Sequence, residues 1–259
     1  MKRLSNIELK EFLDEKVSYY NHQRFIQSDP ISIPHRFSKK EDIEISGFLT
    51  ATIAWGQRIT ILKNANVLLK LMDESPHDFI LNFSKKDLLP FKKFVHRTFN
   101  GVDCIYFLKS LQNIYREKKS LEILFTDQFN AKTDKDFKAA IHGLRQFFFS
   151  LPHADRTLKH FSNPLQGSAS KRINMFLRWL IRKDSSGVDF GLWKFNPSLL
   201  ICPLDVHSAS VARKLGLLKR KQNDWEAAAE LTGKLKSFDP KDPVKYDFAL
   251  FGLGVFEKF

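Results

Sequence analysis

Glycine and proline are scarce in this chain, and cysteine is nearly absent. The 259 residues include 11 Gly and 10 Pro, fewer than average usage would give, and this scarcity disfavours turn-rich β architectures. The 2 Cys, Cys104 and Cys202, have no CxxC spacing, which excludes a disulfide framework, a zinc knuckle and an iron–sulfur loop. Free thiols of this kind fit a reducing cytoplasm, where we expect the protein to act.

Long apolar runs and metal-binding spacings are also missing. No run approaches the roughly 18 apolar residues of a membrane-spanning helix. The first residues carry acids and no long apolar stretch, so we expect no signal peptide and no membrane partner. The 8 His show neither HxH nor HExxH spacing, so we expect no metal site and no cofactor.

Apolar residues recur at three- and four-residue steps along most of the chain, which is the period of amphipathic helices. Most of the 25 Phe fall at this spacing, where a core role is the simplest interpretation. The pattern predicts an all-α protein of about ten helices, in two helical lobes around a central cleft. The predicted helices cover residues 4–20, 43–55, 59–72, 103–116, 120–129, 134–150, 170–183, 205–215, 224–236 and 244–257. Residues 27–40, which include two prolines, are predicted to form a loop, so we divide the chain into residues 1–40 and a main domain of residues 41–259.

Positive charge is the strongest compositional signal. Lys and Arg number 42 against 29 Asp and Glu, a formal net charge of +13, which points to a polyanionic partner. Most of the excess lies in two windows without acids, residues 156–183 and 206–223. Surface helices usually interleave both signs for i,i+4 pairing. The windows therefore favour phosphate binding over the alternative, a merely solvated basic face.

Two segments in and beside these windows have the form of a phosphate-binding turn and of a helix start. Residues 164–171 read Pro-Leu-Gln-Gly-Ser-Ala-Ser-Lys, a hairpin whose backbone N–H groups can bind a phosphate where a helix begins. The alternative role for Ser168 or Ser170 is an ordinary N-cap. Asp205 begins an apolar-periodic helix that Gly216 closes, so a capping role is the alternative there too.

The segment Leu165-Gln-Gly-Ser-Ala-Ser-Lys171 resembles the Leu-Pro-Gly-x-Gly-x-Lys hairpin of the helix-hairpin-helix DNA glycosylases, the endonuclease III and 8-oxoguanine glycosylase superfamily. Pro203-Leu-Asp-Val-His207, followed by Ala212-Arg-Lys-Leu-Gly216, resembles the segment that carries that superfamily's catalytic aspartate. Residues 51–60, Ala-Thr-Ile-Ala-Trp-Gly-Gln-Arg-Ile-Thr, are similar to its helix-turn-helix, whose Gln or Asn enters the duplex beside an extruded base. Residues 171–179 and 242–254 also resemble an uncharacterised bacterial family described only as a domain of unknown function.

The chain departs from the superfamily at several points. Ala169 replaces the second glycine of the hairpin, and Gln166 replaces its proline. An insertion of roughly residues 183–197 lengthens the spacing between Lys171 and Asp205. With 2 Cys the chain has no four-cysteine cluster, so the iron–sulfur branch of the superfamily is excluded.

The resemblance implies a base-excision enzyme that acts on double-stranded, lesion-containing DNA, in the cytoplasm and associated with the nucleoid; a monomer is expected. Lys171 would attack the sugar C1′ and form a Schiff base, and Asp205 would stabilise the positive charge that develops there. The implied DNA-binding residues are Gln57, Arg58, Gly167, Ser168, Ser170, Arg172, His207 and Arg213. The implied base-stacking residues are Trp55 and Trp179, for which a core role is the alternative.

Two other functions stay open on the sequence. A non-catalytic DNA-binding protein would keep the hairpin and lose the chemistry, and an RNA- or protein-binding helical scaffold would account for the charge alone. Lys171 and Asp205 separate the enzyme from both alternatives, because a protein that only binds needs neither residue.

Overall fold

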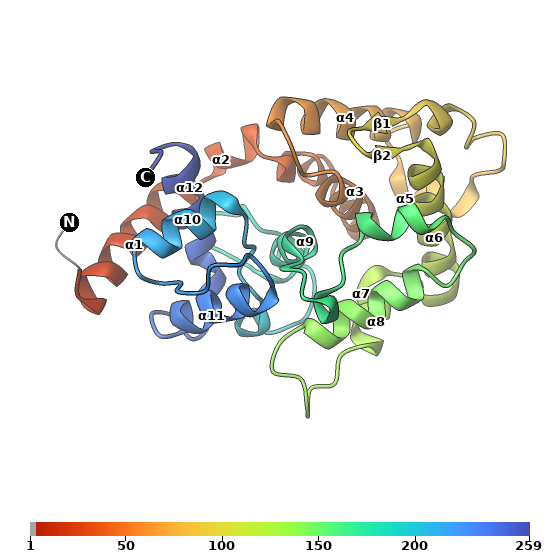
Figure 1. Ribbon diagram of the computed structural model, residues 1–259. Coiled ribbons are helices and arrows are strands. Elements are labelled where there is room, and N and C mark those ends of the chain that lie inside the picture. Colours follow the sequence, from red (N-terminus) through yellow and green to blue (C-terminus); the bar gives the residue numbers. More distant parts are fainter. Residues whose placement is uncertain (1–3) are drawn as a thin grey trace. The chain divides into compact units, whose positions relative to one another are not determined.

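The computed structural model describes residues 4–259, which are largely helical (Figure 1). Residues 1–3, the start of the segment tested for a signal peptide, lie outside the described residues. Over residues 4–259 the α-helices run from α1 to α12, and the only regular strands are the antiparallel pair β1 (Val95–His96) and β2 (Phe99–Asn100). The prediction of an all-α protein is therefore confirmed.

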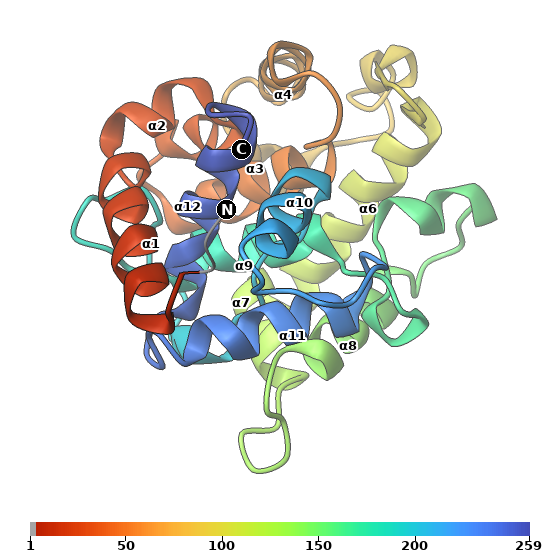
Figure 2. The same cartoon turned by 60° about the vertical axis from the view of Figure 1, so that its left-hand side comes forward.

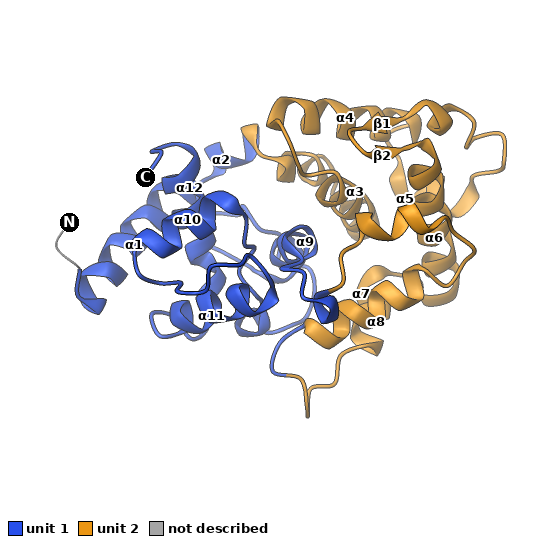
Figure 3. Ribbon diagram, viewed as in Figure 1, with its two compact units in different colours: residues 1–27, 135–137, 164–259 blue, residues 28–134, 138–163 orange. Residues whose placement is uncertain are grey.

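The chain divides into two compact units, shown in different colours in Figure 3. Unit 1 comprises residues 1–27, 135–137 and 164–259, and unit 2 comprises residues 28–134 and 138–163. Each unit is therefore assembled from segments that are distant in the sequence. The helices of unit 1 are α1 (Asn6–Tyr20), η5 (Pro164–Gln166), α9 (Lys171–Ile181), η6 (Pro197–Leu199), α10 (Val206–Lys214), α11 (Trp225–Lys236), η7 (Pro243–Lys245) and α12 (Tyr246–Val255), with α2 (Gln23–Ser28) ending at the boundary.

In unit 1 the apolar helix α12 packs against both α1 and α10 (Figures 1 and 2). The approach to α1 is close at Gly252, because a Cβ atom there would lie 2.2 Å from Cδ2 of Tyr20. Tyr20 Oη also donates a hydrogen bond to Glu257, over 2.7 Å. On the other side, a Cβ at Gly254 would lie 3.0 Å from Cβ of His207 on α10. Small residues on α12 thus let the helices on either side approach its backbone.

Unit 2 is built around α3 (Lys40–Thr52) and α6 (Gly101–Lys118). Its core is rich in phenylalanine, with the rings of Phe107 and Phe148 only 4.7 Å apart. Asn100 caps α6 in a capping box with Asp103. The remaining helices of this unit are η1 (Pro30–Ser32), η2 (Pro34–Arg36), α4 (Arg58–Leu71), α5 (Pro76–Asn82), η3 (Pro90–Lys93), α7 (Leu121–Asp127), α8 (Lys138–Phe148) and η4 (Asp155–His160).

Each of the ten predicted helical ranges contains an α-helix, with ends that differ by a few residues. Sequence analysis missed α2 and α5, which are short, and the predicted loop at 27–40 contains the single-turn helices η1 and η2. A proline at the first position of α5 sets its start, a signal that went unused. No helix in residues 4–259 is both long and apolar enough to cross a membrane.

Candidate functional site

The predicted hairpin is a tight turn that ends where α9 begins. Gly167 has φ +83°, in the left-handed region that favours glycine, and its N–H donates to Pro164 O over 3.1 Å. Ser170 also lies in the left-handed region, with φ +48°. Its N–H donates to Ser168 Oγ over 3.1 Å, and its own side chain does not cap α9. Of the two serines considered as N-caps, Ser170 occupies the N-cap position of α9, but its side chain accepts no capping hydrogen bond.

Two further bonds fix this turn from other elements of unit 1. Asn174, on the first turns of α9, donates through Nδ2 to Ala169 O over 3.1 Å. Trp225 N donates to Gly167 O over 3.1 Å, and Ser168 forms a single antiparallel bridge with Asp224. The turn is therefore held firmly even though Ala169 stands where the glycosylase hairpin has glycine.

Lys171 and Asp205, the predicted catalytic residues, form an ion pair. Lys171 Nζ lies 3.8 Å from Asp205 Oδ2, and the two side chains are 28% and 22% exposed. Asp205 is also the N-cap of α10, because its Oδ1 accepts from Ser208 N over 2.9 Å. One carboxylate oxygen thus caps the helix while the other faces the lysine amine. Capping and functional roles are compatible at this residue.

The other predicted contacts on α10 differ in how freely they face solvent. His207 is exposed. Arg213 is bound within the protein, since its guanidinium donates to Arg220 O over 2.9 Å, to Lys221 O over 2.8 Å and to Asn223 Oδ1 over 2.7 Å. In this structure Arg213 therefore holds the basic segment of residues 219–223 in place. A direct contact to DNA would require it to leave that segment.

Arg172 and Trp179, both on α9, lie deeper than the sequence suggested. Arg172 is partly buried, and desolvation lowers the pKa of its guanidinium to about 10. Trp179 is 0% exposed, so its indole is a core residue and presents no face on which a base could stack. The structure thus supports the alternative for Trp179, a role in the core.

The predicted residues in unit 2 lie where α4 begins. Trp55 is partly buried, and its indole meets the rings of His96 and His160 at centroid distances of 4.8 and 6.0 Å. Gln57 is exposed at the N-cap position of α4 without a capping bond from its side chain. Arg58 Nη1 donates to Ser28 Oγ over 3.5 Å. Within unit 2, Gln57 is thus available for the plugging role that the resemblance implies.

The interpretation of the acid-free windows needs correction. Several of their cations pair with acids that lie outside the windows, some just beyond the ends and others far away in the sequence, so an absence of acids within a window does not leave its charge unpaired. In residues 156–183 the pairs are Arg156 with Asp103, Lys171 with Asp205, Arg178 with Asp189 and Asp247, and Arg182 with Asp184, Asp189 and Asp242. In residues 206–223, Arg220 pairs with Asp224 at 2.6 Å.

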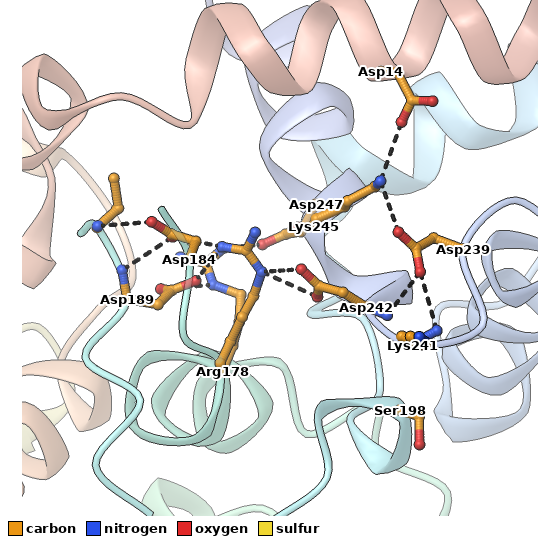
Figure 4. A network of polar contacts seen from close by, with 12 residues as sticks. Asp14, Arg178, Asp184, Asp189, Ser198, Asp239, Lys241, Asp242, Lys245 and Asp247 are labelled. Carbon is orange, nitrogen blue, oxygen red and sulfur yellow. Dashed lines mark hydrogen bonds and ion pairs between the residues drawn. The ribbon is translucent and has the colours of Figure 1, made fainter. Parts of the chain in front are cut away.

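The ion pairs of Arg178 and Arg182 form a buried network that sequence analysis missed (Figure 4). Arg178 donates to Asp189 Oδ1 over 3.3 Å and to Asp247 Oδ2 over 2.5 Å, and its guanidinium lies 4.3 Å from the centroid of the Phe248 ring. Burial raises the pKa of Asp247 to about 6, although Arg178 acts to lower it. The available signal was an arginine among the apolar residues of α9 and an aspartate at the start of the apolar helix α12.

The insertion predicted near residues 183–197 belongs to this network. Asp184 and Asp189 supply carboxylates to Arg182, while the N–H groups of Phe190 and Trp193 donate to carbonyls of α9 over 2.7 and 2.8 Å. The insertion therefore packs along α9, the helix that Lys171 begins. In residues 4–259 no three His, Cys, Asp or Glu side chains are grouped so that they could hold a metal ion.

Comparisons with known proteins place these features in one family. A family model whose description reads Protein of unknown function (DUF2400) matches residues 29–256. That span takes in the hairpin, the Lys171–Asp205 pair and the whole of α12. Searches of curated proteins and of solved structures find no match.

Proposed function

Because the chain belongs to the DUF2400 family, whose description names no activity, we propose its function from the site itself, as a DNA glycosylase with AP lyase activity. The partner is double-stranded DNA that contains a damaged base, bound by a monomer. We propose that the protein acts in the cytoplasm, on the DNA of the nucleoid. Lys171 supplies the nucleophile and Asp205 supplies the carboxylate.

The observation that carries the proposal is the 3.8 Å separation of Lys171 Nζ from Asp205 Oδ2. Both side chains are about a quarter exposed, so the pair is open to a ligand but is not fully solvated. Each residue lies where a helix begins, Lys171 at α9 and Asp205 before α10. Helix starts favour bound anions, and here one of them is preceded by the Gly167 turn.

The chemistry that this pair can perform is a displacement at the sugar C1′. The neutral Lys171 amine attacks C1′, and the C1′–N bond breaks with its electron pair leaving on the base, which takes up a proton. After attack the nitrogen carries two protons: one passes to Asp205, and the other passes to O4′ as the ring C1′–O4′ bond opens, which gives a Schiff base between Nζ and C1′. Before attack Asp205 can accept the proton that Lys171 must lose and pass it to the departing base, which restores the carboxylate. As an anion it also stabilises the positive charge that develops at C1′.

Borohydride trapping tests this proposal directly. Duplexes that carry an oxidised, an alkylated or a deaminated base, or an abasic site, are incubated with the protein and reduced. We expect a covalent complex with the wild type and none with Lys171→Gln. The matched control is Lys241→Gln, an exposed lysine of unit 1, which should be trapped as well as the wild type.

Asp205→Asn separates the charge of this residue from its capping role. Asparagine caps helices about as well as aspartate does, so we expect thermal stability close to that of the wild type. Base release should fall by about 100-fold or more, because the variant loses both the anion and the proton acceptor. Base release at the wild-type rate would remove Asp205 from the mechanism.

The non-catalytic alternative has its own signature in the same experiments. A protein that binds duplex with a steep salt dependence, but is trapped on no substrate of the panel, is a DNA-binding protein that lacks the chemistry. Ala169 in place of the second hairpin glycine favours this alternative. A protein that binds no nucleic acid at all would overturn both functions.

A further inference from the structure

A buried carboxylate on α12 connects the two segments that carry Lys171 and Asp205. Asp247 is 6% exposed, and its Oδ2 accepts from Arg178 Nη1 over 2.5 Å. Arg178 lies on α9 about two turns after Lys171, and so on the same side of the helix. Asp247 is therefore tied to the helix that Lys171 begins.

The other oxygen of Asp247 faces the segment before Asp205. The Cys202 thiol donates to Asp247 Oδ1 over 4.0 Å, and Cys202 N donates to Thr232 Oγ1 of α11 over 2.9 Å. Cys202 itself is 0% exposed. The chain that leads into Asp205 is thus anchored in the interior of unit 1, with Asp247 as one of its contacts.

We propose that Asp247 is a positioning residue for the Lys171–Asp205 pair: it holds α9 through Arg178 and the segment before Asp205 through Cys202, and so sets the separation of Nζ and Oδ2 from the protein interior. The inference rests on the proposed function, because the pair has a chemical role only there. It assigns to α12 a part in the site that the glycosylase motifs do not contain.

Charge balance alone does not account for Asp247. Four carboxylates face only two guanidinium groups in this network, which are Asp184, Asp189, Asp242 and Asp247 against Arg178 and Arg182. Arg178 keeps Asp189 as a partner at 3.3 Å whether or not Asp247 is present. Asp247 is therefore a buried carboxylate beyond what the two guanidinium groups need for charge balance. Its desolvation costs folding free energy, so we look for a second role for it.

Asp247 and the pair also influence each other electrostatically. Burial raises the pKa of Asp247 to about 6; Arg178 lowers it, the Asp205 charge raises it and the Lys171 charge lowers it. The charged or titratable groups that face Asp247 are Arg178 and Lys171 from α9, Asp189 from the insertion, and Cys202 and Asp205 from the segment before α10. Because such interactions are reciprocal, we expect ionisation of Asp247 to change the electrostatic environment of the Lys171 amine.

The test is a pH titration of the full-length protein without nucleic acid, in which the Lys171 signal reports the ionisation of Asp247. Lysines are dimethylated with ¹³C-formaldehyde and a borohydride-type reductant, which keeps their charge. The Lys171 methyl signal is assigned by its loss in Lys171→Arg. We expect this signal to show an inflection near pH 6 in the wild type, as Asp247 ionises. The inflection should disappear in Asp247→Asn, and trapping of the covalent complex should fall about 10- to 100-fold, as misplacement of a reacting group predicts.

Asp242→Asn is the matched control. It removes a carboxylate from the same network, but one that pairs with Arg182 rather than with Arg178 or Cys202. The inflection at Lys171 should therefore remain in Asp242→Asn, whereas a purely structural role would make the two variants alike.

The outcomes distinguish this inference from the proposed function. A wild type that is trapped on DNA but shows no inflection would overturn the positioning role and leave the glycosylase intact. An inflection that only Asp247→Asn removes supports the positioning role, even if no substrate of the panel is processed. If Asp247→Asn does not fold, the absence of the inflection in the wild type still overturns the positioning role, and an inflection that persists in His207→Gln supports it.

Discussion

Asp103 in unit 2 is a fully buried carboxylate shared by several groups. Its Oδ2 accepts from Asn100 N over 3.0 Å and from Arg156 Nη1 over 2.9 Å, and its Oδ1 accepts from Thr157 Oγ1 over 2.9 Å. His160 Nε2 lies 3.3 Å from Oδ2. The residue therefore joins the start of α6 to η4, because it accepts hydrogen bonds from both.

Asp103→Asn should destabilise the protein strongly, because it keeps the shape and removes the charge. Asparagine turns one acceptor oxygen into an NH2 group that faces hydrogen-bond donors, and leaving a buried donor unsatisfied costs about 1–3 kcal/mol. Denaturant unfolding followed by circular dichroism measures the change. Asp155→Asn, an exposed residue of η4, should change the free energy of unfolding by less than about 0.5 kcal/mol. Equal effects of the two substitutions would contradict the role given to Asp103.

At the scale of single residues, motifs in the sequence identified a pair of neighbouring residues, but the sequence did not predict which side chains are buried. Lys171 and Asp205 were singled out by their motifs, and the structure brings them within 3.8 Å; their catalytic roles stay a prediction. Trp179 was assigned to a base pocket, yet it is 0% exposed. Helical periodicity predicts α9 itself, but it predicts neither that residues 173–181 are buried on all sides nor which acids from other elements meet them. The sequence therefore did not predict that Asp189 and Asp247 pair with Arg178.

At the scale of elements, helix positions were predicted well because they depend on local periodicity and caps. The six-residue α2 contains too few residues to show a period. α5 is as long as α7, which was predicted, and the proline at its first position was the signal for it. The hairpin contacts could not be predicted, because Trp225 N reaches Gly167 O from a different part of the chain. These long-range bonds place the basic segment of residues 219–223 beside the hairpin, since Asp224 bridges Ser168.

That placement predicts that the basic segment extends the DNA contact of the hairpin. Lys219 and Lys221 are exposed, and Arg213 holds the backbone at Lys221. Lys219→Gln/Lys221→Gln should weaken duplex binding and reduce the slope of log K against log salt by about 2, or roughly one for each phosphate that a lysine no longer neutralises. Fluorescence anisotropy over a salt series measures both quantities.

The control for this double variant removes the same charge elsewhere in unit 1. Lys236 and Lys241 lie at and beyond the end of α11, and Lys236→Gln/Lys241→Gln should leave the salt slope close to that of the wild type. If both double variants reduce the slope equally, binding depends on net charge alone and the segment of residues 219–223 has no special place in it.

At the scale of the whole molecule, several of the cations lie in ion pairs within each unit. The net charge of +13 still favours a polyanion, but the cations that can contact one are fewer than the total suggests. Trp55, Gln57 and Arg58 belong to unit 2, and the other predicted site residues belong to unit 1. The sequence could not predict this division, because both units interleave distant segments of the chain.

The buried carboxylates of unit 1 give the stability of the whole protein a pH dependence that can be assigned. Burial raises the pKa of Asp247 from 3.8 to about 6, so between about pH 4 and pH 6 the folded state binds more protons than the unfolded state does. The free energy of unfolding must then fall as pH rises through that window. The contribution of Asp247 is fully present below about pH 4 and is lost above about pH 6.

Asp247→Asn isolates this contribution, because asparagine does not titrate. We expect the unfolding free energy of the wild type to fall more steeply between pH 4 and pH 6 than that of the variant, by at most about 1.4 kcal/mol per pH unit for one proton. Urea unfolding at half-unit steps of pH measures both curves. All other titratable groups remain in both proteins, so their contributions cancel in the difference. Parallel curves would show that Asp247 titrates alike in the folded and unfolded states, and would contradict the pKa raised by burial.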